Sequence, residues 1–136
     1  MKWSYLNPPD LPDWSSFFSQ IVCVEQHGSK QVFVAGQVGV NAKKQLTRDG
    51  GFAAQTEQAF VNLGKALANV GGTWADIAML TIYVVGYEES QAAEIGRVMS
   101  KRFATNKLPA CSLIGVQSLA DHRFLIEVES VAIVKV

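Results

Sequence analysis

The chain has 136 residues, of which 49% are hydrophobic and 18% charged, and its 12 basic and 12 acidic side chains give a formal net charge of zero. This length and apolar content suit one globular domain with a sizeable core. A nucleic-acid-binding protein usually carries a basic excess or a basic stripe. Neither is present, so we expect no nucleic-acid partner. No run of about 18 apolar residues occurs, so we expect no membrane partner.

The two cysteines, Cys23 and Cys111, form no CxxC pair and no zinc-ligand pattern with the histidines. Two thiols in a domain of this size indicate a reduced, cytoplasmic protein. The sequence also has no glycine-rich phosphate loop followed by a helix. We therefore predict neither a metal site nor a cofactor.

Residues 1–16 contain three of the four prolines and two of the three tryptophans. Proline removes a backbone donor and interrupts regular pairing. The composition therefore predicts an irregular N-terminal arm over residues 1–16, followed by a single domain over residues 17–136.

Two β-rich segments open this domain, Phe17–Glu25 and Gln31–Gly36, and a short turn with Gly28 makes them a predicted hairpin. From Phe52 to Val70, apolar residues recur at spacings of three and four, which predicts an amphipathic helix. Gly71 and Gly72 supply its C-terminal stop.

The second half of the chain predicts four more elements. Asp76–Gly86 is continuously apolar and β-branched, which is typical of a strand buried on both faces. A helix is expected over Glu88–Phe103, and Pro109 prevents it from continuing. Two final strands are expected over Cys111–Leu119 and Arg123–Val136.

The expected order is therefore two strands, a helix, a strand, a helix and two strands. This order favours an α+β fold, with a mixed sheet covered on one face by two helices. The other face needs a partner, because apolar strand positions would make it adhesive. A homo-oligomer would bury these positions, which we identify as Val32, Phe33, Val84 and Ile133.

Glu127 and Glu129 are the candidate polar residues of the last predicted strand. They are two residues apart, so they share one strand face with apolar neighbours. Such a carboxylate is costly unless it is paired or solvated. Two readings stay open: a solvated sheet edge, or a carboxylate that orients a water molecule or a substrate amine.

Two other candidates have a structural alternative. Cys111 is either a small buried hydrophobic residue or a reactive thiol, and a thiol needs a nearby base or cation that the local sequence does not offer. Phe17 and Phe18 either pack in the core or line an apolar ligand pocket.

Five segments together resemble the YjgF/RidA family of reactive-intermediate deaminases over roughly residues 17–134. They are the following, in chain order: Phe17-Phe18-Ser19-Gln20; Val34-Ala35-Gly36-Gln37-Val38; Gly71-Gly72 with the strand after it; Leu108-Pro109-Ala110-Cys111-Ser112; and Ile126-Glu127-Val128-Glu129-Ser130-Val131-Ala132.

The resemblance implies a chorismate-mutase-like α+β fold and a homotrimer with three ligand clefts between subunits. It also implies hydrolysis of enamines or imines, such as 2-aminoacrylate, to ketones and ammonia. In the family an arginine grips the substrate carboxylate bidentately. A glutamate positions the attacking water.

This chain departs from that pattern at three positions. Cys111 stands where the family has the arginine, Phe18 where it has a tyrosine, and Ala35 where it has a serine, while Glu127 is retained. We therefore predict Glu127 and Cys111 as catalytic residues. The predicted substrate-binding residues are Phe18, Ala35, Gly36, Cys111 and Ser112.

A thiol cannot replace a guanidinium, so we expect the standard 2-aminoacrylate deaminase activity to be lost or weak. The expected function is a hydrolase or deaminase-type, or ligand-binding, activity on a small imine, enamine or carbonyl metabolite in an inter-subunit cleft. The alternative is a non-catalytic trimer that binds a small molecule or a protein.

Overall fold

The computed structural model describes residues 1–136 as six strands, two α-helices and one short 3-10 helix. The strands are β1 (Lys2–Leu6), β2 (Ile21–Gln26), β3 (Ser29–Val38), β4 (Ile77–Val85), β5 (Ala110–Val116) and β6 (Ile126–Lys135). The helices are α1 (Phe52–Asn69), η1 (Trp74–Asp76) and α2 (Gln91–Ser100).

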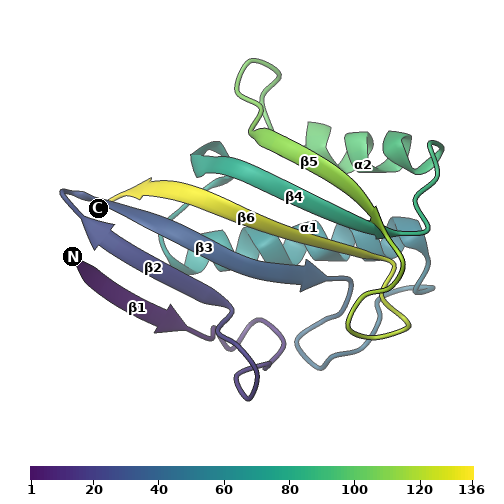
Figure 1. The fold of residues 1–136 in the computed structure, drawn as a ribbon, viewed down its shortest axis with the longest axis horizontal. Helices are drawn as coiled ribbons and strands as arrows, with labels where there is room; N and C mark the ends of the chain where they lie inside the picture. Colours follow the sequence, from purple (N-terminus) through teal and green to yellow (C-terminus); the bar gives the residue numbers. More distant parts are fainter.

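The six strands form one mixed sheet in the order β1-β2-β3-β6-β4-β5. Every neighbouring pair is antiparallel except β4 and β5, which are parallel and connected through α2. A parallel pair needs such a crossover. Figure 1 shows both helices behind the sheet, so the predicted mixed sheet with two helices on one face is confirmed.

The core lies between this helical layer and the sheet. Along β6 burial alternates with a period of two, so Ile126, Val128 and Ala132 face α1 while Glu127 and Glu129 face the uncovered side. In β4, Leu80 and its alternate neighbours are likewise buried. The prediction that 76–86 is buried on both faces is wrong, because the strand's uncovered face is only partly buried in the chain.

The uncovered face carries fewer of the predicted apolar residues than expected. Phe33 and Ile133 are exposed there, but Val32 and Val84 are fully buried on the helical side. The register partners of Phe33 and Ile133, which are Val131 and Gln31, also lie on the uncovered side. The face is apolar, but Val32 and Val84 do not contribute to it.

The N-terminal segment is more regular than predicted. Residues 2–6 form β1 at the sheet edge (Figure 1), paired from Lys2↔Glu25 to Leu6↔Ile21. The prolines begin only at Pro8, so the preceding residues keep the donors that a strand needs. The prediction of an irregular arm is therefore wrong for residues 2–6 and describes only the stretch between β1 and β2.

Most other elements are shorter than predicted. The first predicted strand begins at Ile21 rather than Phe17, and residues 17–20 belong to the preceding loop. Both α2 and β6 begin later and end earlier than predicted. Strand β5 begins one residue earlier than predicted and ends at Val116 rather than Leu119. No helix is both long enough and apolar enough to cross a bilayer.

Candidate functional site

A cavity of about 490 Å³ lies where the end of β3 meets the start of β6. Three segments build it: the loop before β2, the end of β3, and the loop that leads into β6. Its lining consists of Trp14, Phe17, Phe18, Gly36, Val38, Ala120, Asp121, Phe124 and Glu127. We call it the Glu127 cavity.

Gly36 makes room for the carboxyl group of Glu127. The ladder between β3 and β6 shifts register between Val34 and Gln37, so Gly36 lies in an irregular part of the strand. A Cβ atom on Gly36 would lie only 1.7 Å from Oε1 of Glu127. The carboxyl group of Glu127 therefore packs directly against the backbone of Gly36. It fills the space that a side chain at residue 36 would need.

Gln20 fixes the aromatic loop against this strand. Its side chain is fully buried; Nε2 donates to the carbonyl oxygen of Pro12 at 2.9 Å, and Oε1 accepts from Nε2 of Gln37 at 2.8 Å. Within the loop, the backbone N–H groups of Phe17 and Phe18 donate to the carbonyl oxygen of Trp14. These bonds bring the loop aromatics to the cavity wall.

The surroundings of Glu127 favour its neutral form. Burial raises the pKa of Glu127, and the negative charge of Glu129 adds to this effect, with no hydrogen bond to oppose it. A carboxyl group of this kind exchanges protons closer to neutral pH than an ordinary glutamate does. It is therefore suited to act as a general acid or base.

Asp121 is the second acid of the lining, and it is ionised. Nε and Nη2 of Arg123 each donate to its carboxylate at 3.0 Å and lower the pKa of Asp121 to about 2. This bidentate pairing occupies the Arg123 guanidinium. The other nearby cation is Lys44, whose Nζ lies 4.5 Å from the centroid of the Trp14 ring.

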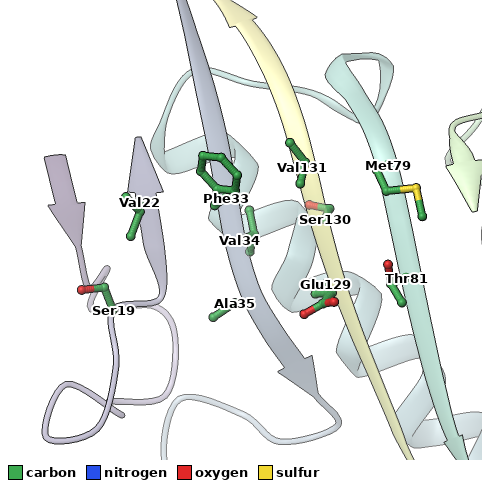
Figure 2. A pocket seen from close by; sticks show the side chains of 10 residues that line it. All are labelled: Ser19, Val22, Phe33, Val34, Ala35, Met79, Thr81, Glu129, Ser130 and Val131. Atoms are coloured by element: carbon green, nitrogen blue, oxygen red, sulfur yellow. The ribbon is translucent and has the colours of Figure 1, made fainter. Parts of the chain in front are cut away.

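A second hollow of about 350 Å³ lies on the uncovered face of the sheet. Ala35, Glu129 and Thr81 line it, and Figure 2 shows them with the apolar side chains of β3, β4 and β6. Within this surface, the hydroxyl of Tyr83 donates to Oε1 of Glu129 at 2.7 Å and the pKa of Tyr83 is raised as a result. Glu129 is thus paired, whereas Glu127 is not.

The predicted site residues therefore fall into three groups. Phe18, Gly36 and Glu127 meet in the Glu127 cavity, while Ala35 lies in the second hollow. Cys111 and Ser112 line neither.

Cys111 lies apart from Glu127 of the same chain. It pairs with Leu80, which puts it on the helical side of the edge strand β5, whereas Glu127 pairs with Tyr83 on the opposite side. Two strand spacings separate β5 from β6, or about 10 Å. Cys111 is exposed, and partial burial raises the pKa of its thiol, which disfavours the reactive thiolate.

The sequence analysis did not identify five residues of the lining: Trp14, Val38, Ala120, Asp121 and Phe124. Trp14 and Phe124 are aromatic residues in loops, outside any helix or strand periodicity. Large aromatic residues in loops are not explained by a core predicted from periodicity. Their position outside the periodic segments could therefore have indicated a ligand cavity.

Comparison with known proteins gives consistent matches. Residues 12–134 match the protein family described as Endoribonuclease L-PSP. The RutC family protein YjgH of Escherichia coli (strain K12) is 34% identical over 97 residues, which cover 71% of this chain and 72% of that protein. A 2-iminobutanoate/2-iminopropanoate deaminase of Dermatophagoides farinae is 26% identical over 130 residues, covering 96% and 95% of the two chains.

A solved structure extends this likeness to the fold. YyfB from Yersinia pestis, a protein of unknown function of the conserved Rid protein family, is 34% identical to this chain. It superposes with a TM-score of 0.72 and covers 97% of this chain and 98% of its own.

Proposed function

Because this chain belongs to the YjgF/RidA family, we propose that it hydrolyses a small imine or enamine, or acts on a related carbonyl metabolite, in the Glu127 cavity. The observation that carries the proposal is the position of Glu127: its carboxyl group lies on the backbone of Gly36 inside an aromatic cavity, with a raised pKa. A relative named as an imine deaminase supports the reaction class.

The proposed chemistry requires one group that both accepts and donates a proton. Neutral Glu127 first donates a proton to the β-carbon of an enamine, which becomes an iminium ion. The Glu127 carboxylate then accepts a proton from water as the water oxygen adds to the iminium carbon. Glu127 returns that proton to the nitrogen of the resulting carbinolamine; as the C–N bond breaks and the C=O bond forms, the carboxylate takes the hydroxyl proton and ammonia leaves.

We propose that hydrolysis of 2-aminoacrylate itself is lost or weak. Cys111 occupies the position of the family's carboxylate-binding arginine, and the lining of the Glu127 cavity contains no lysine, arginine or histidine. Losing a charged hydrogen bond costs roughly 1.5–3 kcal/mol, or about ten- to over a hundredfold in binding.

The proposal includes a homotrimer whose clefts lie between subunits. Cys111 and its own Glu127 lie on opposite faces of the sheet, so only a neighbouring copy could bring the two positions together. Exposed apolar residues on the uncovered face, such as Phe33 and Ile133, support such an association. Light scattering should give three times the 14.8 kDa mass of one chain, and a monomer would contradict this part of the proposal.

The direct test is ammonia release from imines generated in situ, with and without a carboxylate group. We expect a carboxylate-free imine to turn over and 2-aminoacrylate to react slowly or not at all. Glu127→Gln should abolish turnover, and Glu89→Gln is the matched control, because Glu89 is an exposed acid away from the cavity. Turnover of 2-aminoacrylate at the rate of active family members would refute the proposed loss.

The alternative function is a non-catalytic trimer that binds a small molecule or a protein. It is favoured by the exposure of the two loop aromatics, Phe17 at 84% and Phe18 at 44%, which would present an apolar contact surface. Tight ligand binding without turnover of any imine would favour this alternative. RNA cleavage is not proposed, because the cavity carries acids rather than the basic groups that bind phosphates.

A further inference from the structure

The Glu127 cavity has an unusual combination of aromatic rings and acids. Four of its nine lining residues are aromatic, namely Trp14, Phe17, Phe18 and Phe124. The only ionisable groups that this chain contributes to the lining are the carboxyl groups of Glu127 and Asp121. The lining that this chain contributes therefore combines aromatic and acidic groups and contains no lysine, arginine or histidine.

The neighbouring cations do not supply an anion-binding group. The guanidinium of Arg123 is held by Asp121 through two hydrogen bonds of 3.0 Å. The ammonium of Lys44 lies over the Trp14 ring at 4.5 Å, within the range of a cation–π contact. The Arg123 guanidinium carbon likewise lies 5.9 Å from the centroid of the Phe124 ring, so two rings of the lining have a cation of this chain near them.

Aromatic faces and carboxylates together are the groups that recognise organic cations. The ring quadrupole attracts a cation placed over its face, and the attraction grows when water is excluded. A bound cation would favour the ionised form of Glu127, which then adds a charge partner that no side chain of the chain engages by a hydrogen bond. A carboxylate-bearing ligand would instead place its anion next to two acids.

We propose that the Glu127 cavity selects organic cations without a carboxylate group, and that its substrates are iminium ions with an apolar or aryl substituent. This inference rests on the proposed function for its reaction but not for its binding. The iminium form R₂C=NH₂⁺ is both the cation that the cavity would bind and the species that water attacks. The balanced reaction is R₂C=NH₂⁺ plus H₂O to R₂C=O plus NH₄⁺.

The test compares three small aryl probes of different charge: benzyltrimethylammonium, benzyl alcohol and phenylacetate. Dissociation constants are measured by titration in NMR or calorimetry at neutral pH and low salt. We expect the cation to bind at least tenfold more tightly than the alcohol, and phenylacetate to bind most weakly. Equal or tighter binding of phenylacetate, or no measurable binding of the cation, would overturn the inference.

Two variants assign the selectivity to the named groups. Glu127→Gln should weaken binding of the cation about tenfold and leave benzyl alcohol unchanged, and Phe18→Leu should reduce the preference for the cation while keeping an apolar wall. Glu89→Gln is the control for loss of one negative charge elsewhere. An unchanged preference for the cation in Glu127→Gln would contradict the assigned role.

Binding and turnover separate the two proposals. Permanent cations such as benzyltrimethylammonium cannot be hydrolysed, so their binding does not depend on catalysis. Cation-selective binding without hydrolysis of any imine would refute the proposed function and leave this inference standing. Hydrolysis of an imine together with preferential binding of phenylacetate would refute this inference and leave the proposed function standing.

Discussion

The contact between Gly36 and Glu127 makes a sharp prediction for Gly36→Ala. The new Cβ would lie 1.7 Å from Oε1 and 2.4 Å from Cδ of Glu127, whereas real Cβ contacts essentially never fall below 3.0 Å. The carboxyl oxygen must therefore move by at least 1.3 Å, the difference between these limits. Misplacing a reacting group by about 1 Å can cost roughly a hundredfold in rate.

The fold should tolerate the same substitution. Gly36 does not have a positive φ, and the atoms that must move belong to the end of a flexible side chain. Replacing glycine where alanine fits changes stability by about 1 kcal/mol or less, mainly through the unfolded chain. We therefore expect Gly36→Ala to lose about a hundredfold in turnover while its unfolding free energy stays within about 1 kcal/mol of the parent.

Two measurements check this reasoning. Carbon NMR of labelled glutamate should show the pKa of Glu127 falling toward its ordinary value in Gly36→Ala, because the displaced carboxyl group reaches water. In a Glu127→Ala background, adding Gly36→Ala should not lower the unfolding free energy further, because the carboxyl group that clashes with the new Cβ is absent. Gly96→Ala in α2 is the control, since nothing lies within 4 Å of its added Cβ. Normal turnover and an unchanged Glu127 pKa in Gly36→Ala would refute the reasoning.

Three further predictions concern charge. Cys111→Arg should raise 2-aminoacrylate hydrolysis at least tenfold, by restoring roughly 1.5–3 kcal/mol of carboxylate binding, whereas Cys111→Ser should not; no gain would remove Cys111 from the substrate site. The pKa of Glu127 is higher in the folded than in the unfolded state. Its protonated form therefore contributes stability at a pH below the unfolded-state pKa, and this contribution is lost as pH rises through the folded-state pKa. Urea unfolding should therefore show the unfolding free energy of Glu127→Gln rising relative to that of the parent as pH increases from acidic to neutral, and an equal pH dependence of the two proteins would contradict the reasoning. Glu57→Gln should lower the unfolding free energy at pH 7 by about 1–2 kcal/mol, because Glu57 bonds the Arg102 guanidinium at 3.0 Å and that side chain is only 12% exposed. Its lowered pKa means that this loss disappears as pH falls through the pKa of Glu57. Glu94 is the control, because its partner Arg97 has a side chain that is 49% exposed, and the expected cost of removing this pair is below about 1 kcal/mol.

The fold was predictable wherever one face of an element is buried in the chain itself. The spacing in residues 52–70 predicted α1 almost to its ends, because the helix buries one stripe against the sheet. The composition of β4 predicted a strand but not its environment. Its uncovered face carries Met79 and Tyr83, apolar and aromatic residues that one chain leaves partly exposed.

The edge strand β1 was missed because its signal is weak and local. Its five residues lie next to a proline-rich stretch and are too few to show a clear alternation of apolar and polar positions. Pairing with β2 decides that they form a strand. Trp3 and Tyr5 alternate onto one face and stack with their ring centroids 6.4 Å apart. This alternation was present in the sequence but could be read only once the partner strand was known.

Only part of the lining of the Glu127 cavity was named from the sequence, and its geometry was not predictable. Glu127 and Gly36 were both identified, yet their contact depends on the register shift in β3, which no local pattern of the sequence indicates. The aromatic wall depends on Gln20, whose buried amide holds the loop to the strand through Pro12 and Gln37. Such long-range bonds are set by the folded topology.

Two independent features lead us to expect that the site disfavours a substrate with a carboxylate group. One is the proposed replacement of the family's arginine by Cys111, and the other is the composition of the Glu127 cavity. Under the proposal for Cys111, the substrate site lacks a positive charge that the family carries, and the cavity lining of this chain has aromatic residues beside two acids. If only the arginine had been lost, the result would be a weakened site for the same anionic substrate. Aromatic rings together with an unpaired carboxyl group favour a ligand of opposite charge. The two proposals together therefore predict a changed substrate class rather than a weakened form of the family reaction.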